Sequence, residues 1–135
     1  DEFEVKVCPL HLSSAEPEAL KINGYTKEAW SEALLLPHAL ALLSQFVGIT
    51  SPYFMAYNVS FDRSFLEKAY RDCKLKYPFH YHHLDLLTLA WAKLPPGSSL
   101  SLKNVCIALG IEPEPEVHGA LNGARKAYEV YKKLL

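Results

Sequence analysis

Three short stretches of the sequence place carboxylate or histidine side chains where they could take part in catalysis or metal binding. The first, residues 57–62, is a polar turn that follows a short apolar run and leads into a helical pattern. Open α/β sheets usually bind ligands at the carboxyl ends of central strands, so Asp62 is a candidate metal ligand or catalytic carboxylate. The alternative is structural, because an aspartate at the start of a helix often caps it.

The second stretch surrounds His118, which opens the last helical pattern after an acidic, proline-rich loop over residues 112–116. An accessible imidazole with a pKa near neutrality suits general-base catalysis. The alternative for His118 is a solvated loop histidine without a catalytic role.

The third stretch, residues 80–85, brings three histidines close to Asp85. Such spacing is compatible with zinc binding. No second ligand cluster and no nearby cysteine accompanies it, so we favour Asp85 as the cap of the helix that begins at Leu86.

The composition indicates one ordinary globular domain. The 135 residues are 50% apolar and 21% charged, and 14 basic against 15 acidic side chains leave a net charge of −1. This balance gives no basic footprint of the kind typical of nucleic-acid binders. No apolar run reaches the roughly 18 residues of a membrane span, so no membrane contact is expected. Three cysteines without a CxxC pair favour buried thiols in a reducing, cytoplasmic setting.

The elements expected to position these residues mix strands with helices. Residues 10–26 are predicted as a loop on the basis of their serines, proline and Asn-Gly turn signal. Strands are predicted over residues 3–7 and 53–57, and helices over residues 27–36, 40–47, 62–73, 86–91, 102–109 and 120–134. This order predicts an α/β fold in which two strands are too few to form a complete sheet.

Four groups of residues follow one another in order over nearly the whole chain. They are Asn58, Phe61, Asp62, Phe65 and Leu66, then Asp85, Leu89 and Ala90, then Ser101, Leu102, Cys106, Leu109, Gly110 and Ile111, and finally His118, Gly119, Ala120, Leu121, Ala124, Glu129, Val130 and Tyr131. Taken together, these motifs resemble the 3′–5′ exonucleases of the DEDDh class, the DnaQ-like family that includes proofreading epsilon subunits of bacterial DNA polymerase III.

The resemblance implies an RNase H-like mixed sheet flanked by helices, and hydrolysis of the terminal phosphodiester at a 3′ end of DNA or RNA. In the family two Mg²⁺ or Mn²⁺ ions are held by several carboxylates. Asp62 matches a metal ligand, His118 the general base and Asn58 a substrate-binding position. Tyr57 stands where many members have histidine, and it and Phe61 could stack bases, although core packing is the expected place of Phe61. The implied partners are a single-stranded 3′ end and a DNA polymerase subunit.

Two departures from the family pattern bear on activity. No Asp-x-Glu strand is present, and Gly123 stands where the final aspartate is expected. We therefore expect a single exonuclease-like domain over residues 1–135, N-terminally truncated relative to the family and missing its first strand or strands, that is inactive alone. The alternatives are a degenerate relative that serves as a nucleic-acid-binding or protein-interaction module, and an unrelated α/β binding domain with accidental matches.

Overall fold

The sheet of this chain is small, as a computed structural model that describes residues 1–113 and 119–135 shows. Within these residues two strands pair in parallel, β1 (Phe54–Ala56) and β2 (His83–Asp85), with Phe54 opposite His83 and Ala56 opposite Asp85. Parallel strands need a crossover connection, and α3 (Val59–Asp72) supplies it. The fold is therefore mixed α/β, as predicted.

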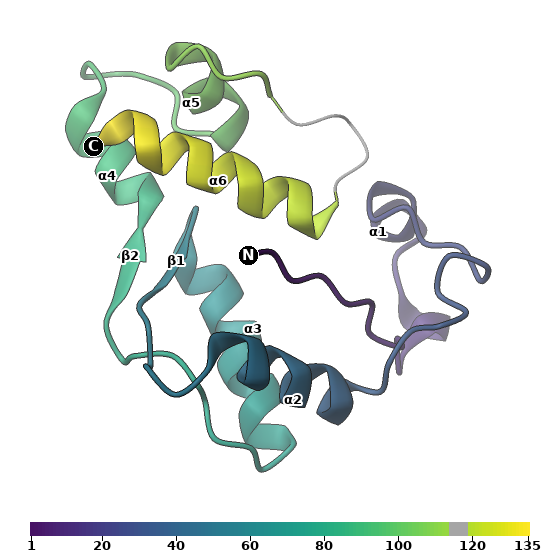
Figure 1. Cartoon of the computed structure of the whole chain (residues 1–135). Coiled ribbons are helices and arrows are strands. Elements are labelled where there is room, and N and C mark those ends of the chain that lie inside the picture. Colours follow the sequence, from purple (N-terminus) through teal and green to yellow (C-terminus); the bar gives the residue numbers. More distant parts are fainter. Residues whose placement is uncertain (114–118) are drawn as a thin grey trace.

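Helices lie on two sides of the strands (Figure 1). α2 and α3 lie on one side, and α4, α5 and α6 gather on the other, where α6 contacts both α4 and α5. The remaining described elements are η1 (Leu12–Ser14), α1 (Pro17–Ile22), α2 (Leu36–Val47), α4 (Leu86–Lys93), α5 (Leu102–Ala108) and α6 (Ala120–Leu134). Among the described residues, no helix is long and apolar enough to cross a membrane.

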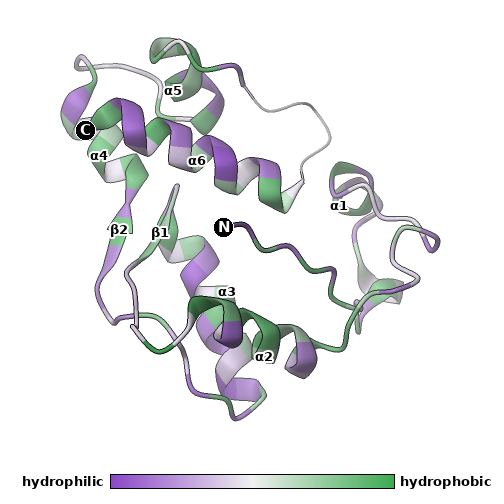
Figure 2. Ribbon diagram, viewed as in Figure 1, coloured by the Kyte–Doolittle hydropathy of each residue, from purple (hydrophilic) through white to green (hydrophobic). Residues whose placement is uncertain are grey.

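Each group of helices has its own packed centre. A buried cluster joins α4, α5 and α6, and its members are Ala90, Val105, Cys106, Ile111, Val130 and Leu134. On the other side, Tyr70 of α3 is 1% exposed, and its hydroxyl donates to the Leu40 carbonyl at 3.0 Å and lies 2.9 Å from Ser44 Oγ. This hydroxyl ties α3 to α2, which is hydrophobic along most of its length (Figure 2).

Several helix ends lie where single glycine or serine residues in the sequence predicted them. Gly48 follows α2 with a φ of 72°, a conformation that glycine adopts at little cost, so the predicted end of this helix is confirmed. Ser101 caps α5 by accepting a hydrogen bond from the Asn104 amide at 3.2 Å. The expected stop at Pro37 is wrong, because Pro37 lies in the first turn of α2, where its missing N–H has no helical role.

The predicted strand over residues 3–7 is wrong. Phe3, Val5 and Val7 are half-buried while Glu4 and Lys6 are exposed, as a strand with one covered face would be. The segment forms only one parallel bridge, between Val7 and Leu34. Alternation reports which side chains are covered, but a strand also needs a neighbouring backbone, and among the described residues Phe3–Val5 has none.

Three further predictions need correction. Residues 27–32 form turns rather than a helix, and α2 begins only at Leu36. Lys6 donates to the Ala29 carbonyl at 2.9 Å and Leu34 pairs with Val7, which holds this stretch against the N-terminal segment. The predicted loop over residues 10–26 contains η1 and α1. The strand β2 was not predicted, since its three residues carry polar side chains at both ends.

Candidate functional site

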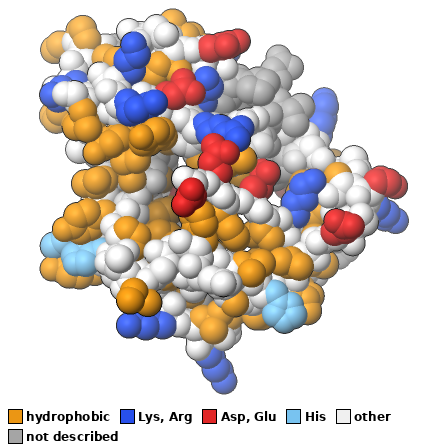
Figure 3. Space-filling view, viewed as in Figure 1, with side chains coloured by type: hydrophobic (Ala, Val, Ile, Leu, Met, Phe, Trp, Pro, Cys, Tyr) orange, Lys and Arg blue, Asp and Glu red, His pale blue; other side chains and the backbone are white. Residues whose placement is uncertain are grey.

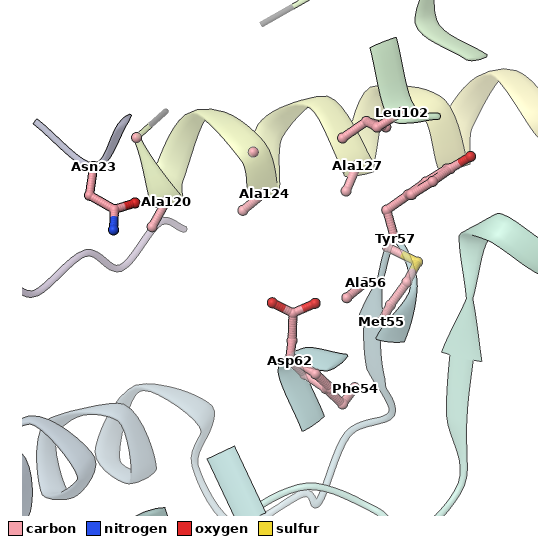
Figure 4. A pocket seen from close by; sticks show the side chains of 12 residues that line it. Asn23, Phe54, Met55, Ala56, Tyr57, Asp62, Leu102, Ala120, Ala124 and Ala127 are labelled. Atoms are coloured by element: carbon pink, nitrogen blue, oxygen red, sulfur yellow. The ribbon is translucent and has the colours of Figure 1, made fainter. Parts of the chain in front are cut away.

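A pocket of about 480 Å³ opens at the carboxyl end of β1, between this strand, the start of α3 and α6. Asp62 and Gly123 both line it, so the structure brings together two positions that lie far apart in the sequence. Figure 4 shows the Asp62 carboxylate pointing across the open space toward α6. The described lining residues are Asn23, Phe54, Met55, Ala56, Tyr57, Asp62, Leu102, Gly119, Ala120, Gly123, Ala124 and Ala127.

Asp62 is held in place by a tight turn between β1 and α3. Asn58 adopts the left-handed conformation, with φ 59° and ψ 56°, which asparagine tolerates better than most residues. α3 then begins at Val59, which is 1% exposed, and Asp62 falls in its first turn. The pKa of Asp62 is raised because neighbouring groups remove water from its carboxylate, an effect that a hydrogen bond from its own backbone partly opposes.

Asp85, at the end of β2, supports this turn from the neighbouring strand. Its Oδ1 accepts hydrogen bonds from the amides of Asn58 at 3.0 Å, Val59 at 3.3 Å and Leu87 at 3.2 Å. Its Oδ2 accepts from Thr88 Oγ1 at 3.0 Å. The expectation that Asp85 caps the helix beginning at Leu86 is therefore confirmed. The same carboxylate also fixes the start of the helix that carries Asp62, which the sequence did not reveal.

Tyr57 lines the pocket while its hydroxyl is engaged elsewhere. The ring packs against the core of α4–α6, and the hydroxyl donates to the Leu100 carbonyl at 2.7 Å. The pKa of Tyr57 is raised, chiefly by burial and further by the nearby Asp85 and Cys106. What Tyr57 offers to the pocket is therefore ring surface rather than a free hydroxyl.

Phe61 does not lie in the core, and that expectation is wrong. It is 61% exposed, and its ring contacts that of Phe65 at a tilt of 57°, with 5.0 Å between centroids. The physical reason is that this face of α3 borders a second pocket instead of a packed neighbour. The exposed ring is free to contact a ligand that reaches Asp62.

In the histidine stretch, the rings of residues 80–82 contact one another at tilted angles. Tyr81 lies 4.4 Å from His80 and 3.9 Å from His82, measured between ring centroids, and the His82 amide donates to His80 Nδ1 at 3.1 Å. Arg63 contacts His83. Among the residues that the structure describes, no group of three or more histidines, cysteines or acids is placed to hold a metal ion.

The other predicted site residue, His118, lies outside the described residues. Sequence reasoning missed the pocket contributions of Asn23, Met55 and Leu102, which come from three separate segments. Apart from Gly123, it assigned no place in a pocket to the small residues of α6. Their spacing was nevertheless a usable signal, since steps of three and four residues put Ala120, Gly123, Ala124 and Ala127 on one helical face.

The fold and site define an α/β domain in which the Asp62 carboxylate lies in the first turn of the helix that follows a parallel strand. It lines a pocket that the last helix also lines. A model of the RNase T exonuclease family matches residues 1–131. The chain belongs to this exonuclease family. A comparison with curated protein sequences found no match.

The described residues do not fit the pair of divalent ions typical of such exonucleases. Two close cations need several carboxylates to offset their charge. Asp62 is the single acid among the described residues of the pocket, and Gly123 has no side chain to offer a ligand. A magnesium or manganese pair would therefore remain mostly uncompensated here.

Proposed function

We propose that the chain is a 3′–5′ exonuclease domain, spanning residues 1–135, that acts on the 3′ end of single-stranded DNA or RNA. The observation that carries the proposal is the Asp62 carboxylate, which points toward α6 in a pocket at the end of β1 that Gly123 also lines. This is the place where α/β sheets bind ligands. A family match over residues 1–131 supports the same reaction class.

Each site residue has a role that follows from its chemistry. Asp62 would supply one of the carboxylates that hold a divalent cation beside the scissile phosphate. His118 takes a proton from the attacking water. Asn58, Tyr57 and Phe61 contact the terminal nucleotide, and the exposed Phe61 ring provides a surface on which a base can stack.

Activity requires acidic groups beyond those of the described residues. Asp62 alone cannot balance two divalent cations, and the glycine at position 123 removes a carboxylate that the pocket has room for. We therefore propose that the 135-residue chain by itself releases no nucleotides. A polymerase subunit as partner and a cytoplasmic setting stay predictions.

A second function, a noncatalytic module that binds nucleic acid or another protein, is favoured by one observation. Gly123 replaces the aspartate expected at this position and lines the pocket opposite Asp62. A binding module needs neither the Asp62 carboxylate nor an aspartate at position 123, so binding would survive loss of Asp62. The two functions thus differ in whether Asp62 matters.

Release of nucleotides from a 3′-labelled single strand, with Mg²⁺ or Mn²⁺, separates these functions. We expect no release by the chain or by its Asp62→Ala variant. Release is expected when Gly123→Asp is combined with an Asp-x-Glu strand joined ahead of residue 1, since both changes add missing carboxylates. In that background His118→Ala should lower the rate about 10²- to 10⁴-fold, the usual contribution of a general base.

Metal-dependent digestion by the unmodified chain that co-purifies with the protein would contradict the proposal that the chain is inactive by itself. An equal rate for the restored protein, which carries Gly123→Asp and the added Asp-x-Glu strand, and for its Asp62→Ala version would contradict the role of Asp62. Oligonucleotide binding that is the same with and without Asp62, together with no cleavage by the restored protein, would instead favour the noncatalytic module.

A further inference from the structure

A group of aromatic and imidazole rings lies at the amino ends of both strands. Tyr53 directly precedes β1 and residues 80–82 directly precede β2, and because the strands run parallel, the two segments meet at one end of the sheet. The His80 amide joins them by donating to the Pro52 carbonyl at 2.9 Å. The Tyr53 ring meets the His80 ring edge-on, with 4.9 Å between centroids. We call Tyr53, His80, Tyr81 and His82 the ring cluster.

The ring cluster stands on a base of packed aromatic side chains. Phe54 of β1 contacts Phe79 with 5.1 Å between ring centroids, and Phe79 contacts Tyr77 at 5.5 Å. Tyr77 in turn meets the buried ring of Tyr70 edge-on at 5.7 Å. Because Phe54 and Phe79 adjoin the cluster in the chain, this base fixes the place at which its rings emerge.

The two tyrosines of the cluster are open to solvent although their positions are fixed. Tyr81 is 69% exposed and Tyr53 is 58% exposed. The Tyr81 ring lies within contact of both imidazoles, so the cluster presents several planar rings at one place on the surface. Aromatic rings gain free energy when a partner covers them, and stacking on another planar ring is one of their preferred contacts. An ordered, uncovered set of rings is therefore suited to a planar ligand.

The charge around the ring cluster favours a polyanion. Residues 73–84 contain two lysines and three histidines and no acid. Arg63 of α3 contacts His83 and is itself paired with Glu67 at 2.6 Å, so the unmatched positive charge comes from the lysines. On the face that Figure 3 draws, histidine and basic side chains lie at the left and lower edge, near the start of β2 and the end of α3. The acidic ones gather around α6 and to the right.

We propose that the ring cluster is a second binding site for single-stranded nucleic acid, on which unpaired bases stack. Tyrosine and histidine are among the side chains on which proteins stack unpaired bases, and lysines attract the phosphates between them. Stacking uses the face that every base has, so the site accepts any sequence. The choice of nucleic acid as the ligand rests on the proposed function, whereas the place of the site does not. The cluster lies at the amino ends of the strands, and the Asp62 pocket opens at the carboxyl end of β1.

Binding of a fluorescein-labelled oligothymidylate of about ten nucleotides, followed by fluorescence anisotropy, tests this proposal. Divalent cations are left out, so that the Asp62 carboxylate repels phosphate and its pocket contributes little. Tyr81→Ala should weaken binding about 5- to 150-fold, the usual effect of losing one stacked base. Tyr81→Phe keeps the ring and should bind as wild type does.

Two controls separate stacking from other attraction. Trp91→Ala removes an aromatic ring of α4 that is 71% exposed and lies outside the cluster, and it should leave binding unchanged. An oligomer of the same length made of abasic sites keeps the phosphates and has no base to stack. It should bind more weakly than the oligothymidylate, and equally to wild type and to Tyr81→Ala.

Three results would overturn the proposal: no binding of the oligothymidylate, equal binding by wild type and Tyr81→Ala, or equal binding of the abasic oligomer. Shifts of the Tyr81 and His82 ring signals in proton NMR on raising the protein concentration alone would also overturn it, because they assign the cluster to a second copy. Each of these leaves the exonuclease proposal intact if the restored protein releases nucleotides. Conversely, binding that depends on Tyr81 without such release contradicts the exonuclease proposal and supports the ring cluster.

Discussion

Tyr70→Ala is expected to destabilise the domain more than any other substitution considered, by about 3–5 kcal/mol, the usual cost of deleting a large buried aromatic side chain. Tyr70 is 1% exposed, so its loss leaves a cavity between α2 and α3. Its hydroxyl also bonds the Leu40 carbonyl and lies within hydrogen-bond distance of Ser44 Oγ. Urea denaturation followed by circular dichroism measures the change.

Two tyrosine-to-phenylalanine variants separate the hydroxyl from the ring. Tyr70→Phe should cost about 1 kcal/mol, because it removes a bonded hydroxyl and keeps the packing. Tyr77→Phe should be neutral or stabilising, since the Tyr77 hydroxyl is buried without a hydrogen-bond partner among the described residues. If Tyr70→Phe lowered the free energy of unfolding no more than Tyr77→Phe does, the hydrogen bonds between α2 and α3 would contribute nothing to stability.

Asp85→Ala is expected to lower the free energy of unfolding by about 2–4 kcal/mol. One part is the loss of the α4 cap, worth about 1 kcal/mol. The rest comes from the amides of Asn58 and Val59, which lose a charged acceptor at the turn that positions Asp62. Because that turn is the link between the two strands, hydrogen exchange should rise at Asn58 and Val59 as well as in α4.

The control for this prediction is Asp72→Ala. Asp72 pairs with Lys68, one turn away on the exposed surface of α3, and such pairs are worth about 0–1 kcal/mol. The free energy of unfolding of Asp85→Asn should lie between those of wild type and Asp85→Ala. An amide oxygen can replace Oδ1, but the amide nitrogen cannot accept a hydrogen bond from Thr88. A loss for Asp85→Ala as small as that for Asp72→Ala would refute the supporting role.

The parts of the fold that could be predicted from the sequence are those encoded by neighbouring residues. Gly48 ends α2, Ser101 caps α5 and Asp85 caps α4, each through contacts within a few residues. A strand forms only beside a second backbone segment, and the residues of the strand itself do not indicate which segment that is. Residues 3–7 have the right alternation, but in the described part of the chain they form a single bridge, at Val7. β2 has a partner, but its three residues are too few to show a pattern.

The site was predictable in part for the same reason. Asp62 stood out because a polar turn after an apolar run marks a strand end. The double role of Asp85 could not be read from the sequence, since Asn58 lies 27 residues away from it and β1–β2 pairing alone brings them together. The exposure of Phe61 depends likewise on an open groove, which only the packing of α2 against α3 reveals.

Asp62 and position 123 line one pocket, and the titration of Asp62 tests this arrangement most directly. Burial raises the pKa of this carboxyl, so its contribution to stability is full below its ordinary pKa of about 4 and is lost as pH rises through the raised value. Asp62→Asn should therefore stabilise the domain at neutral pH and lose this advantage in acid.

The measurement itself is carbon-13 NMR of the Asp62 carboxyl during a pH titration. In Gly123→Asp the pKa of Asp62 should rise further, because a second carboxylate in the pocket disfavours the charged form. Ala108→Asp, which adds the same charge on α5, should leave it unchanged. An Asp62 pKa that is the same in wild type and Gly123→Asp would contradict the claim that these positions share a site.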